Sequence, residues 1–113
     1  MNQARDNWEI SPAAVRDMLV HDEPFAFLDC RTPEEHAIAR VDSARLLPMQ
    51  DVPERINELE AHLDEPVIVM CHHGQRSLQV AAFLKQQGFT DVKSLAGGID
   101  RWSREIDPTV PRY

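Results

Sequence analysis

Short apolar runs alternate with amphipathic segments along this chain. The runs at 25–28 and 66–70 are almost wholly apolar, which is typical of strands buried on both faces. Positions 44–47 and 92–95 predict two further strands. Helices are predicted at 11–20, from residue 32 onward, and at 53–63, 77–87 and 99–104. This alternation predicts an α/β fold with a mostly parallel sheet and helices on both of its faces.

Local signals mark several of the helix ends. Ser11 followed by Pro12 is typical of an N-cap with proline at the first helical position. Thr32 and Glu35 have the spacing of a capping box. Gly88 follows a broadly apolar helical segment, where a glycine commonly ends a helix.

The length of the chain suits one domain with one hydrophobic core. We therefore expect residues 1–113 to form a single domain, with loose or extended ends at 1–6 and 105–113. In parallel α/β sheets, ligands bind at the carboxyl ends of the strands. Cys71 directly follows the apolar run at 66–70, so it lies at one of these ends.

Charge and composition narrow the possible functions. A formal net charge of −7 argues against nucleic acid as a partner, because a phosphate backbone needs a basic face. The longest uncharged apolar run, 66–71, is too short to cross a bilayer, and the first residues contain no apolar stretch of a secretion signal. Two cysteines are too few for a disulfide framework. We therefore expect a reduced, cytoplasmic protein that binds neither nucleic acid nor membrane.

The segment CHHGQRS at 71–77 contains the clearest candidate chemistry. Cysteine reacts as its thiolate, which is favoured by cations, helix N-termini and inward-pointing amides. Gly74 allows the loop to turn through positive φ, so that its amides face one point. Arg76 adds a planar cation for an anionic substrate, and Ser77 either caps a helix that begins near it or donates its hydroxyl into the loop. The pattern predicts a reactive thiolate at Cys71, with inert packing as the alternative.

Two histidines follow the cysteine directly. His72 and His73 can each add positive charge or assist a proton transfer, although an exposed loop position is the simpler interpretation of both. With Cys71 they do not make a convincing metal site, because three adjacent ligands do not easily converge on one ion. We therefore expect no metal and no cofactor.

Three stretches of the chain resemble the single-domain rhodaneses, which are small sulfurtransferases. They are FLDCRTPEEHAIARV, VIVMCHHGQRSLQVAAFLKQQGF and VKSLAGGIDRW, and together they span about residues 10–102 in the family's order. The resemblance implies a doubly wound, mostly parallel five-stranded sheet. It also implies that Cys71 is catalytic and carries sulfane sulfur as a persulfide. The loop that would bind the substrate and the persulfide consists of His72, His73, Gly74, Gln75, Arg76 and Ser77.

The resemblance further implies a thiosulfate sulfurtransferase activity. The donor would be a small anion such as thiosulfate, and the acceptor a thiol, cyanide or a carrier protein. One stretch departs from the family pattern: Gly-His-Ile-Pro-Gly-Ala is replaced by Ala-Arg-Val-Asp-Ser-Ala at 39–44. Because the proline and glycine that shape this turn in the family are missing, the family's geometry of the turn and of the rim facing the substrate does not carry over to this chain.

By resemblance, Asp29 and Arg31 lie at the carboxyl end of a strand beside that of Cys71. They are either an ion pair that supports the active-site loop or a pair that serves the fold away from the chemistry. Cys30 lies between them and can form a redox-sensitive disulfide with Cys71 if the two strands are neighbours. We expect it to point away from Cys71, because successive strand residues alternate between faces.

Two other function classes remain open. A cysteine phosphatase or arsenate reductase also uses a cysteine loop ending in arginine, but the phosphatases that this loop resembles have one more residue than the four between Cys71 and Arg76. A rhodanese-like regulatory or sulfur-carrier interaction module is the second alternative. Such modules often lose the cysteine or the loop glycine, and this chain keeps both.

Overall fold

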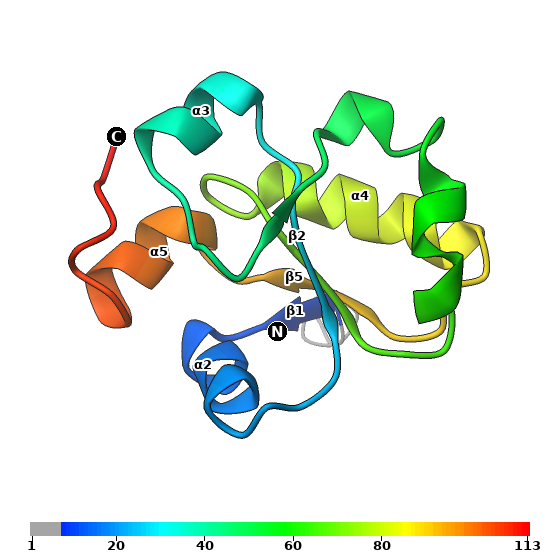
Figure 1. Cartoon of the computed structure of the whole chain (residues 1–113), viewed down its shortest axis with the longest axis horizontal. Coiled ribbons are helices and arrows are strands. Elements are labelled where there is room, and N and C mark those ends of the chain that lie inside the picture. The colour runs from blue at the N-terminus through cyan, green and yellow to red at the C-terminus, as the bar shows by residue number, and fades with distance from the viewer. Residues whose placement is uncertain (1–7) are drawn as a thin grey trace.

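The computed structural model describes residues 8–113, so the loose end expected at 1–6 lies outside the described residues. Strands and helices alternate through most of the described chain (Figure 1). In order, the elements are β1 (Glu9–Ile10), α2 (Pro12–Val20), β2 (Ala26–Asp29), α3 (Pro33–Ile38), β3 (Arg45–Leu46), the 3₁₀-helices η1 (Met49–Asp51) and η2 (Ile56–His62), β4 (Val67–Met70), α4 (Gln75–Gln86), β5 (Val92–Leu95) and α5 (Gly98–Glu105).

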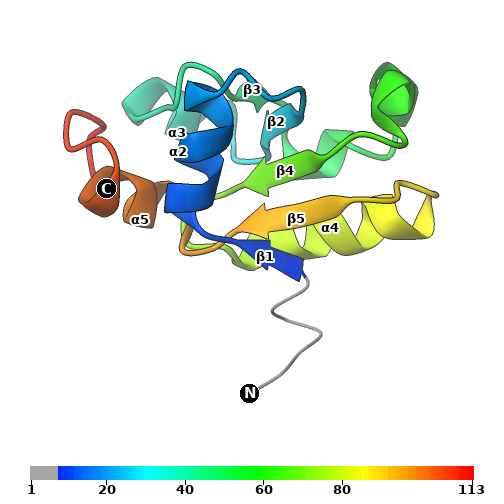
Figure 2. The ribbon, with the colours of Figure 1, turned by 90° about the horizontal axis from the view of Figure 1, so that it is seen from below.

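Within residues 8–113, the sheet has five strands in the order β1-β5-β4-β2-β3, and all neighbouring strands are parallel. The predicted α/β fold with a doubly wound, five-stranded sheet is confirmed. The pattern did not predict β1, because a strand of two residues has no periodicity to read. Figure 2 shows β4 and β5 pointing toward the end of the molecule where α5 and the C-terminus lie.

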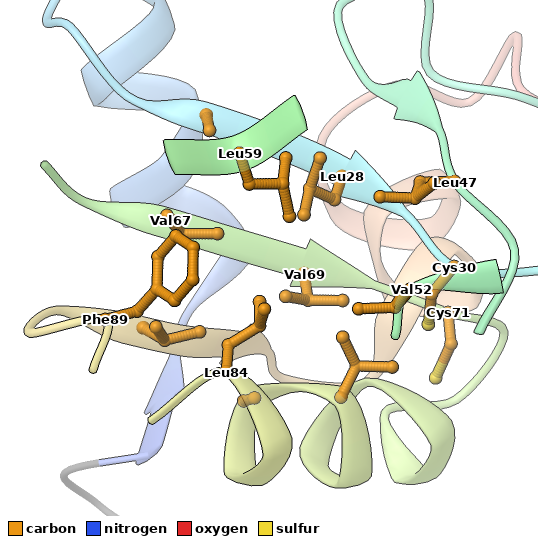
Figure 3. Packing of buried hydrophobic residues seen from close by; sticks show 14 residues of the cluster. Leu28, Cys30, Leu47, Val52, Leu59, Val67, Val69, Cys71, Leu84 and Phe89 are labelled. Atoms are coloured by element: carbon orange, nitrogen blue, oxygen red, sulfur yellow. The ribbon is translucent and has the colours of Figure 1, made fainter. Parts of the chain in front are cut away.

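Helices cover both faces of the sheet, with α4 and α2 on opposite sides in Figure 1. On one face, α4 and η2 pack against a core that contains Leu28 and Val69 (Figure 3). On the other face, α2 and α5 pack against the intervening residues Phe27 and Ile68. The run VIVM of β4 is apolar throughout because both of its faces are covered. Each such buried side chain contributes about 1.5–3 kcal/mol.

The predicted helix caps are present. Ser11 Oγ accepts a hydrogen bond from the backbone of Ala14 at the start of α2. Thr32 and Glu35 form the full capping box of α3, each side chain accepting from the other residue's backbone N–H. Gly88 follows α4 with φ +100°. These local signals therefore mark where α2 and α3 begin and where α4 ends.

The helix predicted at 53–63 differs from the prediction. The structure has turns up to Arg55 and then the 3₁₀-helix η2, with i to i+3 bonds such as Leu63 N to Glu60 O. Ile56 and Leu59 are three residues apart, which fits one face of either kind of helix. Leu59 is completely enclosed, and Ile56 and Leu63 are partly buried against the same core.

The C-terminal segment is more ordered than the loose or extended end predicted at 105–113. A turn covers 108–110, Val110 is buried in the core beside Trp102, and Ser103 Oγ donates a hydrogen bond to the carbonyl of Val110. The chain then leads to Tyr113, whose hydroxyl is hydrogen bonded. No helix in the described part of the chain is long and apolar enough to cross a membrane.

Candidate active site

Cys71 lies at the carboxyl end of β4, in the middle of the sheet. Its side chain is almost completely buried, with 1% of the residue exposed. The backbone N–H of Gly74 donates to its Sγ at 3.0 Å, and Ser77 Oγ lies 3.2 Å from the same sulfur. Gly74 has φ +106°, as the sequence predicts for a loop that turns its amides inward.

Helix α4 begins two residues earlier than predicted. Gly74 is its N-cap residue and Gln75 its first residue, so Ser77 lies in the first turn and does not cap the helix. The Ser77 hydroxyl is therefore directed to the sulfur, which is the second of the two roles considered for it. The helix N-terminus also brings its positive end toward Cys71. Gln75 is exposed to solvent.

The start of α5 holds the backbone of the cysteine loop. Ile99 N donates to the carbonyl of Cys71 at 2.8 Å, and Asp100 N donates to the carbonyl of His72 at 3.1 Å. Gly98 packs so closely on these two carbonyls that a Cβ atom there would lie 2.4 Å from His72 O. The glycine pair at 97–98 therefore forms a turn and also allows α5 to approach the backbone of the cysteine loop closely.

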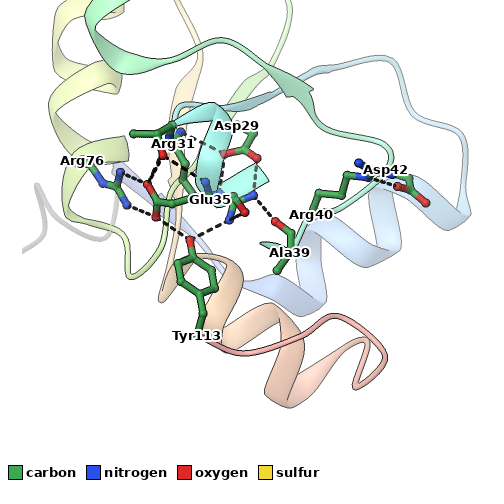
Figure 4. A network of polar contacts seen from close by, with 9 residues as sticks. Asp29, Arg31, Glu35, Ala39, Arg40, Asp42, Arg76 and Tyr113 are labelled. Carbon is green, nitrogen blue, oxygen red and sulfur yellow. Dashed lines mark hydrogen bonds and ion pairs between the residues drawn. The ribbon is translucent and has the colours of Figure 1, made fainter. Parts of the chain in front are cut away.

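Arg76 is paired with a carboxylate and is not a free cation. Its two terminal nitrogens donate to Glu35 at 2.7 and 2.9 Å (Figure 4). The Arg76 guanidinium holds the pKa of Glu35 far below its usual range. The sequence reading assigned Glu35 only to a helix cap. Its contact with Arg76 joins residues 41 positions apart, and no local pattern records such a pair.

Asp29 and Arg31 form a buried ion pair at the end of β2. Arg31 Nε and Nη2 donate to the two oxygens of Asp29 at 2.8 and 2.7 Å, and Nη2 also donates to Ala39 O at 2.6 Å. Both side chains are essentially inaccessible to solvent. Arg31 Nη1 donates to the Tyr113 hydroxyl, and this hydroxyl donates to Glu35 (Figure 4). The pair is thus connected to the loop through Tyr113 and Glu35.

Tyr113 also covers the loop, a contact that no local sequence pattern predicts. Its ring stacks on that of His72 at a centroid distance of 3.9 Å, and His73 lies at 3.9 Å from His72. Burial and the neighbouring His73 lower the pKa of His72. Within the described residues, His72 Nε2 is a buried polar atom without a hydrogen-bond partner. His73 is exposed as predicted, whereas His72 is half-buried.

The prediction that Cys30 points away from Cys71 is wrong. Asp29 pairs with Met70 in parallel register, and the residues that follow them, Cys30 and Cys71, enter the same core (Figure 3). Equivalent residues of neighbouring parallel strands share a face, whatever the alternation along each strand. Both cysteines are free thiols. Burial, Cys71 and Asp29 raise the pKa of Cys30 to about 12.

A small cavity of about 190 Å³ adjoins this region and is lined in part by Cys30, Arg31, Thr32, Gln50 and Arg76. A larger, open cavity of about 860 Å³ lies over residues 36–43 and 106–111. Its lining includes residues 39–43 of the stretch that departs from the resembling family. The described residues contain no group of three His, Cys, Asp or Glu side chains that could hold a metal ion.

Comparison with known proteins identifies relatives across most of the chain. Residues 11–105 match the family model of the rhodanese-like domain. The chain is 37% identical over 102 residues to a sulfurtransferase of Allochromatium vinosum, covering 90% of this chain and 94% of that protein. It is 36% identical over 99 residues to the thiosulfate sulfurtransferase GlpE of Pseudomonas aeruginosa, covering 88% and 86%.

Other relatives are much longer or are known as structures. The match to the adenylyltransferase and sulfurtransferase MOCS3-1 of Zea mays is 32% identical over 96 residues, which is 80% of this chain but only 20% of that protein. The crystal structure of a rhodanese-like domain protein from Staphylococcus aureus superposes with a TM-score of 0.79 at 26% identity, covering 94% of this chain and 98% of the other.

Proposed function

The chain belongs to the rhodanese-like domain family, and we propose that it transfers sulfane sulfur from a small anionic donor such as thiosulfate to a thiophilic acceptor through a persulfide on Cys71. Its sulfurtransferase relatives support the reaction class. One observation supports the role of Cys71 most directly. A buried sulfur at the end of a central strand receives the Gly74 N–H and faces the Ser77 hydroxyl.

The proposed reaction has two displacements. In the first, the Cys71 thiolate attacks the outer sulfur of thiosulfate, the S–S bond of the donor breaks, and sulfite leaves with the bonding electrons. Cys71 then carries the outer sulfur as Cys–S–S⁻. In the second, an acceptor nucleophile attacks that outer sulfur and regenerates the Cys71 thiolate; cyanide leaves as thiocyanate in this step. No net oxidant or reductant is needed.

The loop supplies dipoles for the charges in this reaction. The Gly74 N–H, the Ser77 hydroxyl and the N-terminus of α4 all face the region in which negative charge forms or moves. Fixed donors in a water-poor site stabilise such charge without reorganising during the reaction. The small cavity beside Cys30 and Arg76 is where we expect the donor to approach.

The role proposed for Arg76 is orientation of the donor. Its pairing with Glu35 leaves little net positive charge, so an anion can share the guanidinium but gains little general attraction from it. We expect Arg76→Ala to raise KM for thiosulfate more than it lowers kcat, since the nucleophile is unchanged. An unchanged KM in steady-state assays would assign Arg76 to structure alone.

The acceptor and the cellular setting are also proposals. A thiol or a carrier protein would take the sulfur in a cell, and cyanide serves as the acceptor in an assay. A cytoplasmic setting fits the two free cysteines, because persulfide chemistry needs a compartment that keeps thiols reduced.

The experiment that tests the function is the intact mass of the reduced protein before and after thiosulfate. We expect a gain of one sulfur that disappears on adding cyanide. Cys71→Ser should show no gain, and the matched variant Cys30→Ser should still load. No adduct on folded wild-type protein would contradict the donor proposed here and favour an interaction module. An adduct on Cys71→Ser would contradict the assignment of the nucleophile.

A further inference from the structure

Ser94 lies on β5, next to β4, and forms the second link of a buried chain of hydroxyl groups. Its Oγ lies 2.6 Å from Ser77 Oγ, which in turn lies 3.2 Å from Cys71 Sγ. Ser94 Oγ also lies 3.4 Å from the carbonyl oxygen of Gly74. Ser77 and Ser94 are both completely inaccessible to solvent. The chain therefore runs from the reactive sulfur to a backbone carbonyl of the same loop.

Each hydroxyl has one hydrogen to donate, so the chain can be ordered in two directions. When the sulfur is a thiolate, Ser77 donates to Sγ and Ser94 donates to Ser77. When the sulfur is protonated, its S–H donates to Ser77, Ser77 donates to Ser94, and Ser94 donates to the Gly74 carbonyl. Every hydroxyl hydrogen has an acceptor in both arrangements, and the change needs only rotation about C–O bonds.

We propose that Ser94 is a positioning residue for the reaction at Cys71: acting through Ser77, its hydroxyl stabilises negative charge on the sulfur, and it turns to the Gly74 carbonyl when that charge is absent. The inference deepens the proposed function and rests on it for its catalytic meaning. Charge leaves Sγ as the persulfide forms and returns when the acceptor removes the outer sulfur. A chain that reverses by rotation follows this cycle without moving a heavy atom.

The geometry favours this assignment over a purely structural one. A hydrogen bond to Gly74 O alone would need no contact with Ser77, yet the Ser77–Ser94 distance is the shorter of the two by 3.4 − 2.6 = 0.8 Å. Hydroxyl chains also strengthen one another, because a donor that accepts a hydrogen bond becomes a better donor. Ser77 without Ser94 would be a weaker donor to the sulfur.

Other ionisable groups lie near Cys71 or next to those that do, and the substitution of Ser94 leaves all of them in place. Cys30 after β2 and Arg76 on α4 interact electrostatically with Cys71. His72 follows Cys71 in the loop and interacts with Glu35 on α3 and Asp100 on α5. Glu35 and Arg76 are paired with each other. A change in the pH dependence of Cys71 in a Ser94 variant is therefore due to the hydroxyl chain and not to a change in this set.

The test is the rate of Cys71 alkylation by iodoacetamide as a function of pH, followed by mass spectrometry of the Cys71 peptide. We expect Ser94→Ala to raise the midpoint of the profile by about half a unit to one unit, which makes alkylation about three- to tenfold slower below the midpoint. The control is Ser103→Ala, which removes a buried hydroxyl that bonds Val110 O, away from the sulfur. Its profile should match the wild type.

Two further comparisons distinguish an effect through the chain of hydroxyl groups from a structural role of Ser94. Ser94→Thr keeps a hydroxyl and should retain the wild-type midpoint. Ser94→Val has the shape of the threonine variant but no hydroxyl, so its midpoint should be raised. In a Ser77→Ala background, Ser94→Ala should cause no additional shift, because its path to the sulfur is gone. An unchanged midpoint in Ser94→Ala and Ser94→Val, or an equal shift with and without Ser77, would overturn the proposal.

The alkylation profile does not depend on sulfur transfer, so its outcome is distinct from that of the proposed function. Wild-type protein that fails to load sulfur from thiosulfate contradicts the function, and the profile still decides the role of Ser94. If loading succeeds, Ser94→Ala should lower kcat at a pH below the midpoint and approach the wild-type rate above it, with KM little changed.

Discussion

Replacing Gly98 by alanine would test how the start of α5 controls the position of Cys71. Gly98 has φ +62°, and a Cβ atom there would lie 2.4 Å from His72 O, 2.5 Å from Cys71 O and 2.5 Å from His72 C. All three are backbone atoms of the active-site loop. They cannot be avoided by rotating a side chain, so either the loop or α5 must shift.

The size of the effect follows from these distances. Reaching an ordinary contact of 3.4 Å from 2.4 Å requires a backbone displacement of 3.4 − 2.4 = 1.0 Å. Overpacking of this kind costs about 1–3 kcal/mol, and a left-handed alanine adds about 1–2 kcal/mol. The sum of about 2–5 kcal/mol lowers Tm by about 8 °C or more for a domain of this size. Because Cys71 and His72 move with their carbonyls, sulfur transfer should fall about 100-fold.

The assay pairs a thermal melt with the initial rate of thiocyanate formation from thiosulfate and cyanide, at a temperature where each variant is folded. Gly88→Ala is the matched control. Gly88 also has positive φ, at +100°, but no atom lies within 4 Å of a Cβ built there. We expect it to lose about 1–2 kcal/mol and no activity.

Equal rates for the folded Gly98→Ala and Gly88→Ala proteins would refute the reasoning, even if Gly98→Ala were the less stable. That result would mean that the contacts of Ile99 N and Asp100 N with the loop carbonyls do not determine where Cys71 lies. A rate loss confined to Gly98→Ala would show that the glycine is kept for the geometry of the loop.

Three further predictions concern groups with shifted pKa values. Arg76 lowers the pKa of Glu35, so the ion pair stabilises the folded protein at pH values above the unfolded-state pKa of about 4.3. This stabilisation is lost as the pH falls. The urea midpoint of Glu35→Gln should therefore decline less than that of the wild type between about pH 5 and about pH 3. Burial and a hydrogen bond to Glu35 help to raise the pKa of Tyr113 to about 12, and this is the single tyrosine of the chain. The ultraviolet signal of its phenolate should therefore appear near that pH in the folded protein and near about pH 10 in urea. Because the pKa of Cys30 is about 12, iodoacetamide at about pH 8 should modify Cys71 and leave Cys30 unmodified in peptide mass spectra.

The parts of the fold that could be predicted are those with local causes. The VIVM run needs covered faces on both sides, and it occupies the middle of the sheet. The caps at Ser11 and Thr32 involve residues within three positions of each other, so their spacing alone predicts them. The predicted strand at 66–70 placed Cys71 at its carboxyl end, which is the end where parallel α/β sheets bind ligands.

The parts that could not be predicted depend on contacts between distant segments. Ser94 reaches Ser77 across 17 positions, and Tyr113 reaches Glu35 across 78. No local sequence pattern indicates the distant partner of a serine in a short strand or of a tyrosine after an irregular segment. Cys30 was assigned the wrong direction for a related reason, since alternation along one strand says nothing about its register with the next.

For the proposed persulfide on Cys71, an acidic chain needs a local source of charge stabilisation, and the groups around Cys71 offer mainly dipoles. The Gly74 N–H donates to Cys71 Sγ and the neutral Ser77 hydroxyl lies at hydrogen-bond distance from it, while the charge of Arg76 is matched by Glu35. Dipoles fixed in a buried site act over a short range and are little affected by salt. They therefore favour a charge on the sulfur itself without offsetting the net charge of −7 at a distance. On this basis, stabilisation of charge at Cys71 and attraction of the anionic sulfur donor are separate properties. The proposed role of Arg76 is to orient the sulfur donor more than to provide either of them.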